Sequence, residues 1–391
     1  MRPNGAFLPI LATLLLSLPY AAHAEEGPIA LARGVGLQAQ LTAGHLALTP
    51  PGSGPRDLKT LADLEDIRGR GFDFVRLNVD VDPSAVEEAG LSDTAIAELE
   101  SSVRALADMQ LGVLLNLRPP HGMAASSDAY RRTVASAAQL LARAGASRTA
   151  LLLSSEVQNR ACRRIKAPDW EAALPGLIAA ARDAAPDLTL VVSGIWDDIA
   201  GLARLNPKTL DDSRLVFNFS FFEPERFTRQ GVGHAKDVKG VPWPVDDVAT
   251  DLAMIFTKLL VSAHDISPAE RAARIARARR HIAIYMVGDW SDRHIRSQFA
   301  KLGAWATKHS IPADRLLLGS FGVVAATDRR GGALAADRFR WLDAVRREAD
   351  ARGLAWALQS YANADAIAMD ALGMSQSAAL PLETGSVPVR R

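Results

Sequence analysis

The sequence predicts a (β/α)8 TIM barrel, an α/β fold in which eight parallel strands alternate with helices. Three observations lead to this prediction. Eight short apolar runs end at Gly, Pro, Ser or Asn, helical patterns lie between them, and most runs begin about 40 residues after the previous one. Most runs are apolar at consecutive positions, which is typical of strands covered on both faces. An open doubly wound sheet is the alternative, but that fold usually has a glycine-rich first turn.

The eight predicted strands share this apolar character and these endings. They are residues 31–37, 72–79, 111–117, 150–155, 188–193, 215–221, 316–320 and 354–360.

The segments between the strands have helical spacing. Leucines and an isoleucine recur every three residues over 58–67, and a 3-4-3 apolar pattern over 96–106 follows Ser92, which is a suitable N-cap. Further helices are predicted over 128–144, 169–184, 292–308 and 335–352.

The gap between the sixth and seventh strands is much longer than the others and predicts an insertion over about 225–290. Its first part, 227–245, is rich in Gly and Pro. An amphipathic helix is then expected near 246–264. Ser267-Pro268-Ala269-Glu270 has the spacing of a capping box, with Pro at the first helical position, and predicts the start of a second helix.

Composition narrows the class of protein. The 391 residues include 45 Lys+Arg and 44 Asp+Glu, a formal net charge of +1, and 48% are hydrophobic. This balance argues against a general nucleic-acid binder and against a polybasic membrane protein. The single cysteine, Cys162, excludes an intramolecular disulfide. The usual metal-, nucleotide- and nicotinamide-binding motifs do not occur, so we expect no metal and no cofactor.

The N-terminal segment has the pattern of a secretory signal peptide. Arg2 precedes an apolar run over 7–18, and Ala22-His23-Ala24 is a small-residue cleavage pattern. An uncleaved membrane anchor is the alternative, but the run is short for a span. We therefore expect a signal peptide over 1–24, a barrel over 25–374 and a flexible tail over 375–391. The mature protein would be periplasmic or secreted, with no membrane span.

The carboxyl ends of barrel strands are where reactive groups are expected. Glu156 follows the fourth strand, where partial burial could raise its pKa enough for it to act as a general acid. A structural ion pair with Arg76 or Arg118 is an equally plausible role for this carboxylate.

Four motifs, in order along the chain, resemble the family 5 glycoside hydrolases, the cellulase-type barrels. Residues 33–37 (RGVGL) resemble "RGVNL", and 71–77 (GFDFVRL) resemble "GFDxVRLP". Residues 222–231 resemble "YEPFxFTHQGA", and 356–361 (WALQSY) resemble "WAxWSY". The resemblance spans about residues 30–370. It implies a retaining mechanism on β-linked glucans, with an acid/base after strand four and a carboxylate nucleophile after strand seven.

The chain departs from the family pattern at most of the decisive positions. Glu156 matches the acid/base, and Arg76 is also retained. Serine stands at the nucleophile position, Ser320. The other positions that differ from the family are Ser155, Asn116, Arg118, Ser220 and Gln359.

A serine at position 320 would be a poor nucleophile because its pKa is high without a neighbouring base, and it cannot balance an oxocarbenium-like charge. We therefore expect retaining hydrolysis to be lost or very slow. A rebuilt inverting site is one hypothesis, with Glu156 as acid and Glu223, Asp197 or Asp198 as base. Transglycosylation is the weakest hypothesis because it needs the missing nucleophile.

The remaining hypothesis is a catalytically inactive protein that binds an oligo- or polysaccharide, or a partner, and assists synthesis or export of an envelope polysaccharide. Polar side chains at the strand ends would then bind sugar hydroxyls, and aromatic rings would stack on pyranose faces. The predicted binding residues are Arg76, Asn116, Arg118, Ser155, Trp196, Ser220, Phe222, Ser320 and Gln359, with Trp243 as a further ring. Replacing acidic family residues with Asn116 and Ser320, and a histidine with Arg118, hints at an anionic glycan.

Overall fold

The barrel is closed. The computed structural model describes residues 31–48, 56–57, 61–120, 123–145, 148–154 and 166–360. Eight parallel strands pair in order and the last, β12, pairs back with the first, β1, with Arg33 opposite Trp356 and Val35 opposite Leu358. This closure confirms the predicted (β/α)8 barrel and excludes the open sheet. The barrel strands are β1 (Arg33–Leu41), β4 (Phe74–Val81), β7 (Gly112–Arg118), β8 (Thr149–Leu153), β9 (Thr189–Asp198), β10 (Val216–Phe221), β11 (Leu316–Phe321) and β12 (Ala355–Leu358).

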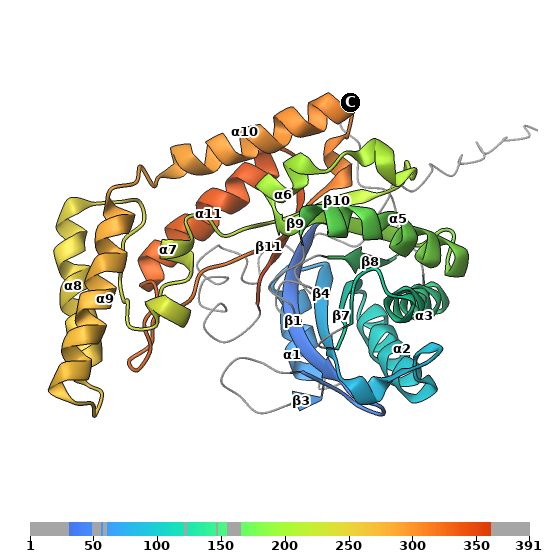
Figure 1. The fold of residues 1–391 in the computed structure, drawn as a ribbon, viewed down its shortest axis with the longest axis horizontal. Helices are drawn as coiled ribbons and strands as arrows, with labels where there is room; N and C mark the ends of the chain where they lie inside the picture. Colours follow the sequence, from blue (N-terminus) through green and yellow to red (C-terminus); the bar gives the residue numbers. More distant parts are fainter. Residues whose placement is uncertain are drawn as a thin grey trace, which may run out of the picture.

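Helices surround the strands as the periodicity predicts (Figure 1). Ser92 is the N-cap of α2, and its side chain accepts a hydrogen bond of 3.3 Å from the backbone N–H of Ala95. The helices that follow barrel strands are α1 (Leu61–Gly69), α2 (Asp93–Asp108), α3 (Asp128–Gly145), α5 (Ala167–Ala184), α6 (Ile199–Arg204), α10 (Asp292–His309) and α11 (Ala335–Ala351). Short 3-10 turns lie at Pro83–Ala85, Pro207–Leu210, Gly233–Ala235 and Ala313–Arg315.

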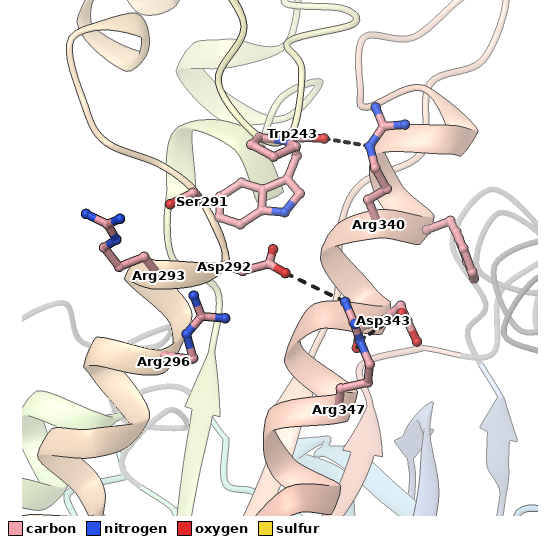
Figure 2. Close-up of a pocket in the computed structure, with 10 residues that line it drawn as sticks. Trp243, Ser291, Asp292, Arg293, Arg296, Arg340, Asp343 and Arg347 are labelled. Carbon is pink, nitrogen blue, oxygen red and sulfur yellow. Dashed lines mark hydrogen bonds and ion pairs between the residues drawn. The ribbon is translucent and has the colours of Figure 1, made fainter.

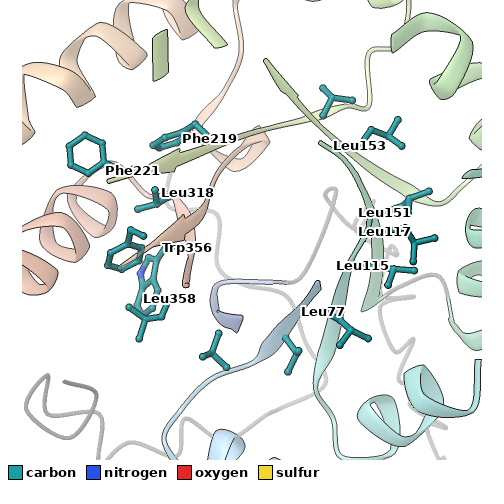
Figure 3. Packing of buried hydrophobic residues seen from close by; sticks show 14 of the residues in the cluster. Leu77, Leu115, Leu117, Leu151, Leu153, Phe219, Phe221, Leu318, Trp356 and Leu358 are labelled. Atoms are coloured by element: carbon teal, nitrogen blue, oxygen red, sulfur yellow. The ribbon is translucent and has the colours of Figure 1, made fainter. Parts of the chain in front are cut away.

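Every barrel strand except β1 contributes to two apolar layers, because successive side chains point to opposite faces. One set fills the barrel interior, where Phe74, Leu114 and Val216 lie together. The alternate set, including Leu115, Leu151 and Phe219, belongs to the larger cluster between strands and helices (Figure 3). Burial on both faces explains why the strands are apolar at consecutive positions.

The insertion follows β10 and forms α7 (Glu225–Thr228), α8 (Asp247–Ser262) and α9 (Pro268–Met286). Ser267 caps α9 as its sequence predicts, accepting a 3.2 Å hydrogen bond from the N–H of Glu270. Figure 1 shows α8 and α9 side by side at one edge of the molecule, beyond α10 and α11.

Two barrel strands are longer than predicted, and four short strands were not predicted. β1 runs to Leu41 because its last four residues continue to pair with β4, as far as Leu41 opposite Val81. β9 extends to Asp198, beyond the predicted 188–193. The unpredicted short strands are β2 (Leu46–Leu48) and β3 (Arg56–Asp57), antiparallel beside β1, and the pair β5 (Val86–Glu87) and β6 (Gly90–Leu91).

The predicted signal peptide, Cys162 and the predicted tail all lie outside the described residues. Among the helices that the structure describes, none combines the length and apolar character needed to cross a bilayer.

Closure of the barrel requires glycine on the inner face of β1. A Cβ at Gly34 would lie 2.3 Å from the ring of Phe74, and a Cβ at Gly36 would lie 2.1 Å from the carbonyl oxygen of Gln359. The second contact is with backbone, so a side chain at position 36 cannot be accommodated by a rotamer change. Gly36 therefore lets the β12 end of the sheet approach β1.

We predict that Gly36→Ala lowers the free energy of unfolding by about 1–3 kcal/mol, because the added methyl group overpacks the β1–β12 junction. Chemical denaturation would measure the change. Gly44→Ala is the matched control, since a Cβ at Gly44 meets no atom within 4 Å. Equal stability of the two variants would contradict the role given to Gly36.

The amino end of β1 is held by a partly buried carboxylate. Asp73, just before β4, accepts hydrogen bonds from the backbone N–H groups of Ala32 (2.9 Å) and Arg33 (3.0 Å). Burial raises the pKa of Asp73 to about 6, despite these two hydrogen bonds, which lower it. The fold therefore favours the protonated carboxyl group more than the unfolded chain does.

This shift predicts a pH dependence of stability. A raised carboxyl pKa contributes stability that is fully present below about pH 4 and is lost as the pH rises through about 6. Asp73→Asn, which cannot ionise, should lose less stability than the wild type between pH 4 and pH 7. Denaturant midpoints measured across that range would show it, and parallel curves for the two proteins would contradict it.

Candidate functional site

Polar side chains occupy the barrel interior near the carboxyl ends of the strands. On β4, Arg76, Asn78 and Asp80 follow Phe74 at every second position, and on β7, Asn116 and Arg118 follow an interior leucine in the same way. The lower interior is apolar, so hydrogen-bonding groups are concentrated at the end where barrel sites form.

Arg76 crosses the barrel. Its side chain is 2% exposed, and its Nη1 donates a 2.7 Å hydrogen bond from β4 to the carbonyl oxygen of Gly319 on β11. Gly319 also leaves room for Asn218, whose Oδ1 would lie 1.9 Å from a Cβ at that position. Arg76 thus holds the strand end that carries Ser320.

Arg118 belongs to a network across three adjacent strands. Its Nε lies 3.2 Å from Oδ1 of Asp80, and its Nη2 donates to Oε1 of Gln38. Nε2 of Gln38 donates a 2.9 Å hydrogen bond to Asp80, which completes the network. Asp80 compensates part of the Arg118 charge, so the mouth is less basic than the substitution of Arg118 alone suggests.

Two buried asparagines have unsatisfied polar atoms. Nδ2 of Asn116 donates to Oδ1 of Asn78 at 3.0 Å. Within the described part of the chain, Oδ1 of Asn116 and both side-chain polar atoms of Asn218 have no hydrogen-bond partner, and both residues are fully buried. Buried polar atoms are nearly always paired, so leaving these atoms unpaired costs stability.

Sequence reasoning missed Asn218. The signal was present: a polar residue stands between Phe217 and Phe219, two positions before Ser220, and therefore on the same face of β10.

The two predicted serines at the strand ends are neighbours. Ser220 on β10 is in register with Ser320 on β11 beside an irregularity in the pairing, and each is 7% exposed. Gln359 follows β12, is exposed and packs its side chain over Gly322. Phe222 is half-buried, with the guanidinium of Arg229 5.7 Å from its ring centroid.

Trp196 is exposed at the end of β9, and its backbone is unusual. Its side chain is 55% exposed, and Trp196 and Asp197 have φ values of 66° and 56°. Two consecutive non-glycine residues in the left-handed region are uncommon and cluster at functional sites. Trp243 differs, because it is fully buried and its ring centroid lies 5.7 Å from that of Phe227. The expectation that Trp243 stacks on a sugar is wrong, since its ring faces are covered.

The three acids considered as alternative bases all have partners in the fold. Asp198 caps α6 through a 2.6 Å hydrogen bond from the N–H of Gly201, and burial raises its pKa. Oε2 of Glu223 lies 2.8 Å from Nε2 of His294 on α10. Asp197 is buried and accepts a hydrogen bond from the hydroxyl of Ser154. These contacts are those of structural carboxylates.

Glu156 and Ser155 lie outside the described residues, so their roles stay predictions. Among the residues that the structure describes, no group of three potential metal ligands comes together.

Asn218 provides a test of whether the mouth is a ligand site. Asn218→Leu keeps the branched shape and the number of side-chain heavy atoms and removes two unsatisfied buried polar atoms, so we predict unchanged or increased stability together with loss of saccharide binding. Thermal unfolding and a binding titration would be measured on the same preparation. Asn116→Leu, which breaks the bond to Asn78, is the matched control and should lower stability. A destabilised Asn218→Leu with full binding would contradict this prediction.

Comparisons with known proteins identify the fold. No protein-family model and no curated protein sequence matches this chain. Solved structures do match. Cellulose synthase subunit Z of Clostridioides difficile is 19% identical over 88% of this chain and 99% of its own, with a TM-score of 0.56.

Two glucanase structures are similar in the same way. A structure described as an endoglucanase is 17% identical over 84% of this chain and 90% of its own, with a TM-score of 0.54. Endoglucanase Cel5A of Thermotoga maritima is 14% identical over 87% of this chain and 96% of its own, with a TM-score of 0.53. At these identities the likeness establishes the fold: the chain has the barrel architecture of these endoglucanases.

Proposed function

We propose that the chain is an exported family 5-like glycoside hydrolase barrel that binds a β-glucan or a related envelope polysaccharide in its mouth, with retaining hydrolysis impaired. The observation that carries the proposal is the serine at the end of β11. Ser320 stands where the resemblance requires a nucleophilic carboxylate, beside an Arg76 that is retained and anchored to Gly319.

The mouth has the chemistry of a saccharide site. Sugar hydroxyls both donate and accept hydrogen bonds, and the unsatisfied atoms of Asn116 and Asn218 include a donor and two acceptors. The exposed indole of Trp196 supplies a flat apolar surface of the kind on which a pyranose ring stacks. Few polar groups beside an aromatic surface are typical of sites that orient a small ligand.

The chemistry of hydrolysis is impaired for a physical reason. A retaining mechanism needs two carboxylates about 5 Å apart, and a hydroxyl at position 320 can neither attack at neutral pH nor stabilise developing positive charge. An inverting mechanism would require a base among Asp197, Asp198 and Glu223, whose contacts with Ser154, Gly201 and His294 favour structural roles.

A specific similarity favours a second candidate function. The chain covers 99% of the length of a protein described as a cellulose synthase subunit. A catalytically inactive barrel that holds the polymer, or a partner protein, would assist synthesis or export of a polysaccharide. The predicted signal peptide is consistent with either function because both place the protein outside the cytoplasm.

The experiment that tests the proposed function places a carboxylate at position 320. Wild-type protein should bind cello-oligosaccharides and show little or no hydrolysis of β-glucans, whereas Ser320→Glu should raise hydrolysis by at least ~100-fold, since a nucleophile is then available. Reducing-sugar release and oligosaccharide titrations would be measured for both proteins. Ser320→Gln is the matched control, with the same size and no charge.

A second variant ties the gain to the predicted acid. Adding Glu156→Gln to Ser320→Glu should abolish the hydrolysis gained. Wild-type turnover equal to that of Ser320→Glu would overturn the impaired mechanism. Absence of both turnover and oligosaccharide binding would overturn the saccharide function and leave partner binding.

A further inference from the structure

A cavity lies outside the barrel wall, between α10 and α11. Its volume is about 440 Å³, within the ~300–1,000 Å³ range of small-molecule sites. Trp243 of the insertion lies over one end, and residues of both helices form its walls (Figure 2). Pro244 also lines the cavity. Of the residues that the sequence predicts to contact a saccharide, Trp243 alone lines it.

The cavity has an excess of positive charge. Four arginines and two aspartates line it. Arg347 pairs with Asp343, Nε to Oδ2 at 3.0 Å, and lies 3.7 Å from Asp292. Arg340 donates to the carbonyl oxygen of Trp243 at 2.8 Å and pairs with a further aspartate.

The positive charges of the other two arginines that line the cavity are not compensated by an acidic side chain among the described residues. Arg293 and Arg296, both on the first turns of α10, are exposed and have no ion-pair partner in the described part of the chain. Guanidinium groups of this kind bind carboxylate and phosphate groups through paired hydrogen bonds.

A buried donor without a partner faces the same space. Trp243 is fully buried, and its Nε1–H has no hydrogen-bond partner in the described structure. Figure 2 shows the nitrogen-bearing edge of the indole turned toward the gap between α10 and α11. An indole N–H can only donate, so this group requires an acceptor, and a buried tryptophan usually has one.

The amino end of α10 also favours the binding of an anion in this cavity. This 18-residue helix begins at the cavity, and its N-cap, Ser291, makes no side-chain capping hydrogen bond. The amino end of a helix carries partial positive charge and unsatisfied N–H groups, both of which favour an anion.

We propose that this cavity binds the oxyanion of a charged sugar, a carboxylate or a phosphate monoester. The oxyanion accepts from Nε1–H of Trp243 and from Arg296, while Pro244 and Phe339 contact the sugar ring. The proposal does not rest on the function of the barrel mouth, because the two sites share no residue.

The test follows the indole N–H of Trp243 by 15N–1H correlation spectroscopy of the full mature protein. Its signal is the one that disappears in Trp243→Phe. Titration with glucuronate and with glucose 6-phosphate distinguishes the two anion classes, and glucose is the neutral probe. We expect a saturable shift of this signal with at least one of the charged sugars and none with glucose.

Arg296→Gln should weaken the binding at least ~10-fold, which corresponds to about 1.4 kcal/mol. Arg279→Gln, at an exposed position on α9, is the matched control and should leave it unchanged. Because position 296 is exposed, the fold should tolerate this change, which keeps the test decisive if Trp243→Phe unfolds the protein. No shift with either charged sugar, an equal shift with glucose, or unchanged affinity in Arg296→Gln would each overturn the proposal.

Discussion

Hydrogen bonding between the first and last strands is the constraint on which the rest of the structure depends. Once β12 pairs with β1, eight strands have no free edge, and their carboxyl ends surround one space. Glycines on the inner face of β1 permit that closure, since a Cβ at Gly36 would collide with the backbone at Gln359. Arg76 then ties opposite sides of the barrel together through Gly319.

Closure also means that polar residues of the mouth are buried, which costs stability where their polar atoms have no partner. Side chains that alternate along each strand point into a shared interior, so the asparagines of β7 and β10 are buried whether or not their polar atoms have partners. A fold selected for stability alone would place apolar residues there, as it does one layer below. The unsatisfied amides therefore favour the ligand-binding role proposed for the mouth.

Much of the fold could be predicted because it depends on local patterns. Consecutive apolar positions identified all eight barrel strands, and caps such as Ser92 and Ser267 identified helix starts. The added length of β1 and β9 could not be predicted, because pairing with a neighbouring strand, and not the strand's own sequence, extends them, in β9 as far as Asp198 opposite Ser220 on β10. The burial of Trp243 was likewise missed, since the insertion packs over it.

The sequence by itself determined the barrel, the insertion and the identity of residues at the strand ends, because periodicity and breaker residues act over short stretches of chain. Tertiary structure alone decided which of those residues have partners. Asp80 pairs with Arg118, Glu223 contacts His294, and the side chain of Asn218 has no hydrogen-bond partner within the described chain. These contacts join residues that lie far apart in the sequence, and only the folded structure brings them within hydrogen-bonding distance.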